Sequence, residues 1–143
     1  MTVDLGPLRR TIGALQEALF TYQSRTTDES LRVLLRDATI QRFAFTFEVA
    51  WKTLKRFLEE NSIEPIDRLT NRQLFRLGFE QGLLRDSAAW MLYLGRRNLT
   101  SHVYSEAIAR QVFEVIPEFL EDARFLLAQL EQRLGEDDRS PHA

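Results

Sequence analysis

The chain has 143 residues, of which 44% are hydrophobic and 28% charged, and its formal net charge is −2. This length suits one compact domain with its own core, and the composition excludes a disordered or fibrous chain. Without Cys there are no disulfides or thiolate metal sites, and two His residues, His102 and His142, exclude a multi-histidine metal centre, so we expect neither metal nor cofactor.

The charge and hydropathy of the chain also bear on location and ligands. The N-terminal residues lack the apolar run of a signal peptide, and no stretch of about 18 apolar residues could cross a bilayer. We therefore expect a cytoplasmic protein. Because there is no overall basic field, an anionic ligand would have to be bound by a local cluster of cations.

Nearly the whole chain is predicted to be helical, since no alternating strand pattern occurs. The first helix is expected over 5–23, where apolar residues recur three or four positions apart: Leu5, Leu8, Ile12, Leu15 and Leu19. Thr26 and Glu29 have the spacing of a capping box, which predicts that a second helix begins near Asp28.

The second helix, expected over 28–61, is the longest. Its main apolar face comprises Phe43, Phe47, Ala50, Trp51, Leu54, Phe57 and Leu58. Charged residues lie opposite, namely Glu48, Lys52, Lys55 and Glu59. Phe45 and Val49 lie outside the main face and form a second apolar strip. This pattern favours burial on two sides, one of which could be another subunit.

Three shorter features follow. Pro65 predicts a non-helical connector over 63–67. Thr70 and Gln73 form another capping box, which opens a short helix that Gly82 could close. Asp86 can cap the helix after it.

The last helix is expected from Ser105 to Leu134, with a kink at Pro117. Residues 135–143 form a polar tail outside a single domain of residues 1–134. The predicted fold is all-α, an antiparallel up-and-down four-helix bundle with one short additional helix.

One polar segment, residues 96–104, lies between two apolar helices and contains the single histidine outside the tail, His102. On a continuous helix Arg97 and His102 would lie about 140° apart and could not share a ligand. The residues between them are weak helix formers, and Ser105 is a favourable N-cap. We therefore expect the helix to break here, which would let the two side chains converge.

Arginine and histidine together suit phosphate chemistry. A guanidinium binds phosphate through two parallel hydrogen bonds, and an imidazole can move protons near neutral pH. The pair suffices in principle for metal-free cleavage of RNA through its 2′-hydroxyl. The spacing alone also fits a surface Arg97 and a His102 that merely caps a helix.

Residues 97–104, RNLTSHVY, resemble the Arg-polar-x3-His-x-Tyr signature of prokaryotic HEPN-superfamily proteins. Residues 47–52, FEVAWK, together with 79–86, FEQGLLRD, and Trp90, resemble the branch called nucleotidyltransferase substrate-binding proteins. The resemblance extends from about residue 5 to residue 134.

The resemblance implies a four-helix bundle that forms homodimers, in which the motifs of two subunits face a shared cleft. Members are commonly paired with a separate minimal nucleotidyltransferase. In the toxin–antitoxin members the bundle is a ribonuclease, which the nucleotidyltransferase silences by adenylylating the motif tyrosine. Carried over, Arg97 would hold the scissile phosphate, His102 would be the general acid/base, Asn98 would orient them and Tyr104 would accept AMP.

Several of these residues also have simpler interpretations. Asn98 could merely end a helix, and Tyr104 could be a hydrophobic staple. Arg96 is either a solvated neighbour or an accessory phosphate contact. Glu48 is a candidate binding residue beside the cleft, or simply an ion-pair partner of Lys52 one helical turn away.

Other aromatic and basic residues have predominantly structural interpretations. Trp51 and Trp90 fit core or dimer packing. Arg68, Arg72 and Arg76 fit a solvated face better than a basic rim for RNA or a partner.

Three functional hypotheses remain open. The first is a metal-independent ribonuclease toxin with a nucleotidyltransferase partner. The second is a non-catalytic subunit that binds nucleotide and docks the transferase, and the third is a helical scaffold with a vestigial motif. The chain cannot be the transferase itself, because no Gly-Ser loop occurs and its one Asp-Asp pair, Asp137-Asp138, lies in the tail.

Overall fold

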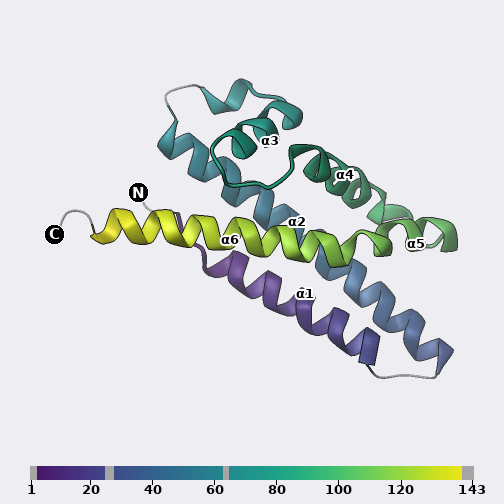
Figure 1. Ribbon diagram of the computed structural model, residues 1–143. Coiled ribbons are helices and arrows are strands. Elements are labelled where there is room, and N and C mark those ends of the chain that lie inside the picture. The colour runs from purple at the N-terminus through teal and green to yellow at the C-terminus, as the bar shows by residue number, and fades with distance from the viewer. Residues whose placement is uncertain (1–2, 25–27, 63–64, 140–143) are drawn as a thin grey trace.

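The computed structural model describes residues 3–24, 28–62 and 65–139, with side chains up to residue 135. Every regular element in these ranges is helical (Figure 1). In chain order they are α1 (Gly6–Ser24), α2 (Glu29–Asn61), the 3-10 turn η1 (Ile66–Arg68), α3 (Asn71–Glu80), α4 (Ser87–Asn98), the 3-10 turn η2 (Leu99–His102), α5 (Glu106–Glu114) and α6 (Ile116–Arg139). The all-α bundle predicted from the sequence is confirmed.

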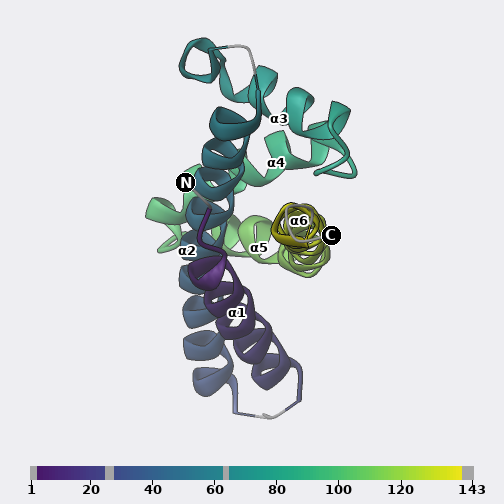
Figure 2. The same cartoon turned by 90° about the vertical axis from the view of Figure 1, so that its left-hand side faces the viewer.

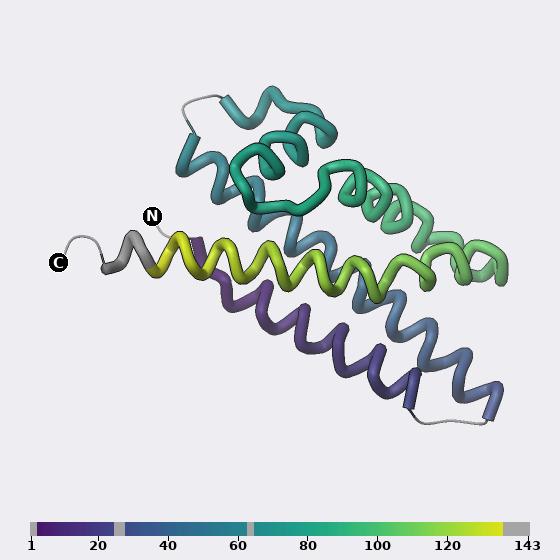
Figure 3. Tube along the Cα trace, viewed as in Figure 1, coloured from purple at the N-terminus to yellow at the C-terminus, as the bar shows by residue number. Residues whose placement is uncertain are grey.

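Helix α2 is the centre of the arrangement. It pairs with α1 as an antiparallel hairpin, and α6 crosses this hairpin obliquely while contacting both helices (Figures 1 and 2). Helices α3 and α4 pack together and cover the C-terminal half of α2, while α5 and η2 also contact it, α5 through the pair of Arg36 and Glu106 in the N-terminal half of α2; Figure 3 traces this path. Every other helical element in the described ranges therefore contacts α2.

An aromatic cluster forms the middle of the core. The rings of Phe43, Phe47, Tyr93 and Trp90 surround Phe119 of α6, with centroids 5.0–6.1 Å apart in mostly edge-on orientations. All five side chains are essentially buried. Large aromatic rings bury much apolar area, so this cluster holds α2, α4 and α6 together.

The predicted helix caps are largely confirmed. Thr70 and Gln73 form the capping box of α3, and the carboxylate of Asp86 accepts from the first backbone N–H groups of α4. The second helix differs in one detail, because its N-cap is Asp28, which accepts from the N–H of Ser30 at 2.9 Å. The predicted capping residue Thr26 lies outside the described residues.

The C-terminal part departs from the prediction in two ways. The expected single helix is two helices, because Val115 interrupts it and Pro117 lies in the first turn of α6. Proline is tolerated there, since the first turn needs no N–H donor, so the result is a break instead of a kink. Helix α6 also continues past Leu134 to Arg139; the tail expected at residue 135 is therefore helical over 135–139.

The segment around Pro65 is also more helical than predicted. The predicted non-helical connector includes a short 3-10 turn, Ile66–Arg68, while residues 63 and 64 lie outside the described ranges. After α3, Gly82 has a φ of 78°, which favours glycine, and this ends the short helix as expected. The backbone then returns so that Leu83 N–H bonds to Gly78 O at 2.8 Å.

Candidate functional site

The polar segment breaks the helix as predicted. Helix α4 ends at Asn98, η2 follows as one tight turn, and Ser105 caps α5 by accepting from the N–H of Ile108. The hydroxyl of Thr100 donates to the carbonyl of Arg97 at 2.7 Å, which satisfies one of the free carbonyls at the helix end. The break places the motif across the last turn of α4 and the short connection to α5.

Arg97 is paired with the central helix. Its Nε lies 2.8 Å from Oε1 of Glu48, and the two side chains are 35% and 37% exposed. The N–H is not directed at the oxygen, so the contact is an ion pair without hydrogen-bond geometry. The predicted pairing of Glu48 with Lys52 is wrong, because the partner of Glu48 comes from α4.

A groove of about 300 Å³ lies beside this ion pair. Its walls combine apolar and polar groups from α2 and the motif segment: Asp37, Ile40, Gln41, Ala44, Phe45, Glu48, Arg97, Thr100 and Val103. Its charged groups are one guanidinium and two carboxylates. The groove is therefore not electropositive, although its one cation is the motif arginine.

His102 and Tyr104 lie next to each other and face solvent. Their ring centroids are 6.0 Å apart and nearly perpendicular, and Tyr104 is 85% exposed. A hydrophobic staple would bury the ring, so that interpretation of Tyr104 is wrong. Within the described residues, no hydrogen bond, ion pair or ring contact joins His102 to Arg97, so a single chain does not bring these two groups into contact.

The two remaining motif candidates have different environments. Asn98 is exposed and its side chain does not cap η2. Arg96 is half-buried, and its Nε donates to the carbonyl of Gln111 at 3.2 Å. Arg96 therefore ties α4 to α5 through Nε, and its role as an accessory phosphate contact stays a prediction.

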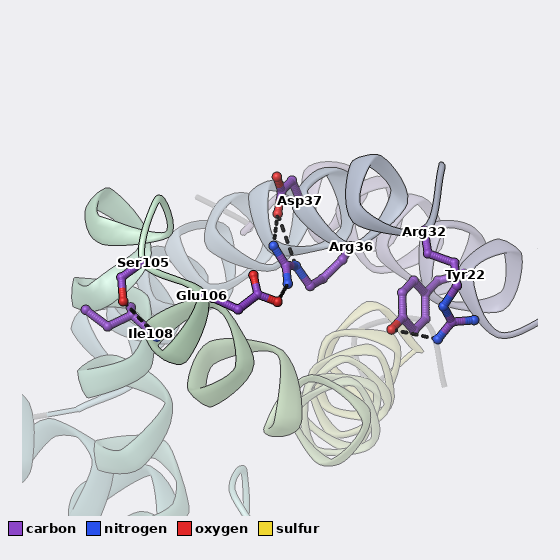
Figure 4. Close-up of polar contacts among 7 residues, drawn as sticks. All are labelled: Tyr22, Arg32, Arg36, Asp37, Ser105, Glu106 and Ile108. Carbon is purple, nitrogen blue, oxygen red and sulfur yellow. Dashed lines mark hydrogen bonds and ion pairs between the residues drawn. The ribbon is translucent and has the colours of Figure 1, made fainter. Parts of the chain in front are cut away.

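An anchor that the sequence did not reveal lies at the other end of the motif segment. Arg36 of α2 contacts Glu106 Oε1 at 2.6 Å and Asp37 Oδ1 at 3.2 Å (Figure 4). The side chain of Arg36 is only 11% exposed. Its hydrogen bond lowers the pKa of the Glu106 carboxyl, while the two carboxylates raise the pKa of Arg36. Helix α2 thus holds the segment on both sides.

A buried polar cluster supports α4 one turn before Arg97. Asp122, which is 5% exposed, accepts from the Tyr93 hydroxyl and from the Arg85 guanidinium. Burial and the hydrogen bond to Asp122 raise the pKa of Tyr93, which keeps the phenol neutral. This cluster was also missed, because nothing local in the sequence links these three residues.

The other side chains considered in the sequence lie outside the motif segment, in the core or on the surface. Trp90 is buried in the core, and the Trp51 indole N–H bonds to Asn71 Oδ1 at 3.1 Å. The arginines on η1 and α3 are exposed, which fits both a solvated face and a basic rim: Arg68, Arg72 and Arg76. Across the described residues, no three acidic or histidine side chains group as a metal site would require, and no helix is long and apolar enough to cross a membrane.

Comparisons with known proteins assign the family. Residues 3–132 match the family described as nucleotidyltransferase substrate binding protein like. Over 96 residues, 66% of each chain, the sequence is 36% identical to a protein of Haemophilus influenzae named probable ribonuclease HepT. The chain thus spans just under two thirds of that relative's length.

Two solved structures have the same fold. One, from Haemophilus influenzae, is described as having the fold of a substrate-binding domain of a nucleotidyltransferase; its TM-score is 0.83 at 28% identity, covering 90% of this chain and 99% of that one. The other, from Thermus thermophilus, has a TM-score of 0.70 at 31% identity and covers 86% and 98%. With the match over residues 3–132, the chain belongs to the family of nucleotidyltransferase substrate-binding-like proteins.

Proposed function

We propose that the protein is the partner subunit of a minimal nucleotidyltransferase and a metal-independent ribonuclease toxin, acting in the cytoplasm. The observation that carries the proposal is the break between α4 and α5, because Arg97 lies in the last turn of α4 and His102 and Tyr104 lie on the short connection that follows. The relative named as a probable ribonuclease supports the same activity.

In the proposed reaction, Arg97 binds the phosphate of an RNA linkage and stabilises the charge that develops on its oxygens. Neutral His102 takes the proton of the 2′-hydroxyl, whose oxygen then attacks phosphorus. The bond to the 5′-oxygen breaks, and that oxygen takes a proton from imidazolium, leaving a 2′,3′-cyclic phosphate and a 5′-hydroxyl. Asn98, which is exposed, would orient the side chains of Arg97 and His102.

The proposed active form is a homodimer in which two motif segments share one cleft. This would supply Arg97 with a histidine from the other subunit, since its own His102 is not in contact with it. The outer face of α2 supports the proposal, because Leu31, Leu34 and Phe45 are 45%, 66% and 56% exposed. Exposed apolar side chains at helical spacing favour burial against a partner.

Tyr104 is the proposed site of silencing. Its phenol is 85% exposed and follows His102 by two residues. The partner transferase would join the phenolic oxygen to the α-phosphorus of ATP and release pyrophosphate. The added AMP would then carry a negative charge into the place where the RNA phosphate binds.

A second candidate function is a non-catalytic subunit that binds nucleotide and docks the transferase. The structural neighbour described as a nucleotidyltransferase substrate-binding domain favours it. The two functions differ in one measurement, because only the first requires the purified protein to cut RNA.

The test is an RNA cleavage assay with and without EDTA. The ribonuclease proposal requires wild-type cleavage that EDTA does not reduce and that His102→Ala or Arg97→Ala lowers by at least about 100-fold. An active His102→Ala protein would contradict the mechanism. Nucleotide binding with no cleavage by the wild type would favour the docking subunit. Intact mass after co-expression with the transferase, compared with Tyr104→Phe, tests the modification.

A further inference from the structure

We propose that Glu48 is the positioning residue of Arg97: it holds the guanidinium through Nε and leaves the two terminal nitrogens for a substrate phosphate. The inference rests on the proposed function and deepens it, because it adds a residue from α2 to a site otherwise formed by the motif segment.

The atoms in contact carry the argument. Glu48 Oε1 lies 2.8 Å from Nε of Arg97, and Nε itself is buried. The Arg97 side chain nevertheless retains 35% exposure, which must belong to its other atoms. Within the described residues, neither terminal nitrogen of Arg97 forms a hydrogen bond, and the contact with Glu48 is made at Nε. The carboxylate thus engages the guanidinium from one side only.

A phosphate is best bound by two parallel N–H groups of the guanidinium fork. A carboxylate that bound both terminal nitrogens would occupy the donors that a phosphate needs. Contact at Nε instead leaves both terminal nitrogens unoccupied. Glu48 can therefore remain in place while a phosphate binds at the far end of the same group.

The position of Glu48 on α2 suits it to fix the rotamer of Arg97. It lies in the middle of α2, the helix that every other element contacts, and beside the groove lined by Phe45 and Arg97. An unsupported arginine side chain has many rotamers, and binding would have to select one of them. A side chain already fixed by Glu48 meets the phosphate in a productive orientation.

An opposite role for Glu48 would follow from charge alone. The groove is also lined by Asp37, so two carboxylates and one guanidinium belong to its walls. If Glu48 acted chiefly by repelling anions, its removal would tighten RNA binding and raise activity. Positioning therefore predicts that removing Glu48 lowers the activity, and repulsion predicts that it raises the activity.

The chain offers a matched control at Glu131. Its Oε2 lies 2.9 Å from Nε of Arg9, so a carboxylate also contacts an arginine Nε between α6 and α1, here with hydrogen-bond geometry in addition. Both side chains are partly exposed, at 53% for Arg9 and 43% for Glu131. Neither residue lines the groove or belongs to the motif segment. The Glu131 substitutions therefore remove a similar ion pair without touching Arg97.

The experiment compares Glu48→Ala, Glu48→Gln, Glu131→Ala and Glu131→Gln in RNA cleavage. We expect Glu48→Ala to lower kcat by about 10-fold to 100-fold, with a much smaller change in KM, because misorientation mainly affects the transition state. Glu48→Gln should recover little of the loss, since the contact lacks hydrogen-bond geometry and a neutral amide cannot replace the charge of the carboxylate. The Glu131 variants should match the wild type. Unchanged or increased kcat in Glu48→Ala would overturn the proposal, and so would an equal loss in Glu131→Ala.

A second readout does not depend on nuclease activity. The Nε–H signal of Arg97, assigned by its loss in Arg97→Lys, is followed by NMR while inorganic phosphate is added. We expect Glu48→Ala to shift and broaden this signal and to weaken phosphate binding at Arg97, while Glu131→Ala leaves it unchanged. The same Arg97 signal in Glu48→Ala and wild type would overturn the inference. If the wild type cuts no RNA but Glu48→Ala alters the signal, the proposed reaction fails and the positioning role stands.

Discussion

The hydroxyl of Tyr93 donates a hydrogen bond to Oδ2 of Asp122 across 2.5 Å, in the buried space between α4 and α6. Arg85 binds the other oxygen of the same carboxylate, so its charge is compensated. Tyr93 lies one helical turn before Arg97, and the bond therefore fixes the part of α4 from which the motif arginine extends.

Replacing Tyr93 with Phe should destabilise the protein. The change leaves one oxygen of a buried carboxylate without its donor, and we expect a loss of about 1–3 kcal/mol in the free energy of unfolding. Urea denaturation of the variant and wild type measures it. Tyr104→Phe is the control, because Tyr104 is exposed and the same change should leave stability within experimental error. Equal stabilities for Tyr93→Phe and wild type would contradict the proposed importance of the bond.

The Arg36–Glu106 contact should make the thermal stability of the protein depend on pH. Arg36 lowers the pKa of Glu106 below its ordinary value of 4.5, so the folded state favours the ionised carboxylate. The stabilisation is present above about pH 4.5 and is lost as pH falls through the lowered pKa. Thermal unfolding between pH 7 and pH 3 should show a smaller decrease in Tm for Glu106→Gln than for the wild type. Parallel curves would show that this contact does not affect stability.

Gly78→Ala should destabilise the contact between α3 and α2. A Cβ at this position would lie 3.1 Å from Leu84 Cδ1 and 3.3 Å from Leu54 Cδ1, within a packed core. We expect a loss of about 1–3 kcal/mol, since overpacking displaces its neighbours. Gly13→Ala is the opposite case: no atom lies within 4 Å of its Cβ position in α1, so it should gain about 0.5–1 kcal/mol. Chemical denaturation of both variants should give changes of opposite sign.

Phe45→Glu should convert the proposed homodimer to a monomer. Phe45 is 56% exposed on the outer face of α2, so a charge there should disrupt the partner contact without disturbing the core. Light scattering coupled to size exclusion measures the mass. Phe79→Glu, which changes a 50% exposed phenylalanine on α3, should remain a dimer. A dimeric Phe45→Glu protein would place the interface elsewhere.

The sequence predicted most of the fold, because its signals are local. Capping residues such as Thr70 and Asp86 act within one turn of the chain, and their helices begin where expected. The predicted kink at Pro117 is wrong for a related reason. Proline is incompatible with a helix interior but suitable for a first turn, and the residues beside Pro117 do not show which of the two positions it occupies.

The candidate site was less predictable, because its contacts join residues distant in the chain. The break before Ser105 followed from local propensity, but Glu48 meets Arg97 only after α4 has packed on α2. Periodicity placed Glu48 and Lys52 on one face of their helix and suggested the wrong partner. The Arg36–Glu106 anchor joins positions 70 residues apart and left no pattern in the sequence.

The central place of α2 has a consequence for biosynthesis. During translation the α1–α2 hairpin is complete before any residue of the motif has been added, and its contacts are close in sequence, so it can fold early. Glu48 would then already be fixed on a formed helix when Arg97 leaves the ribosome. The unfinished chain already has Glu48 on a formed helix but lacks Arg97, and a truncated product ending before α4 would lack the whole motif segment.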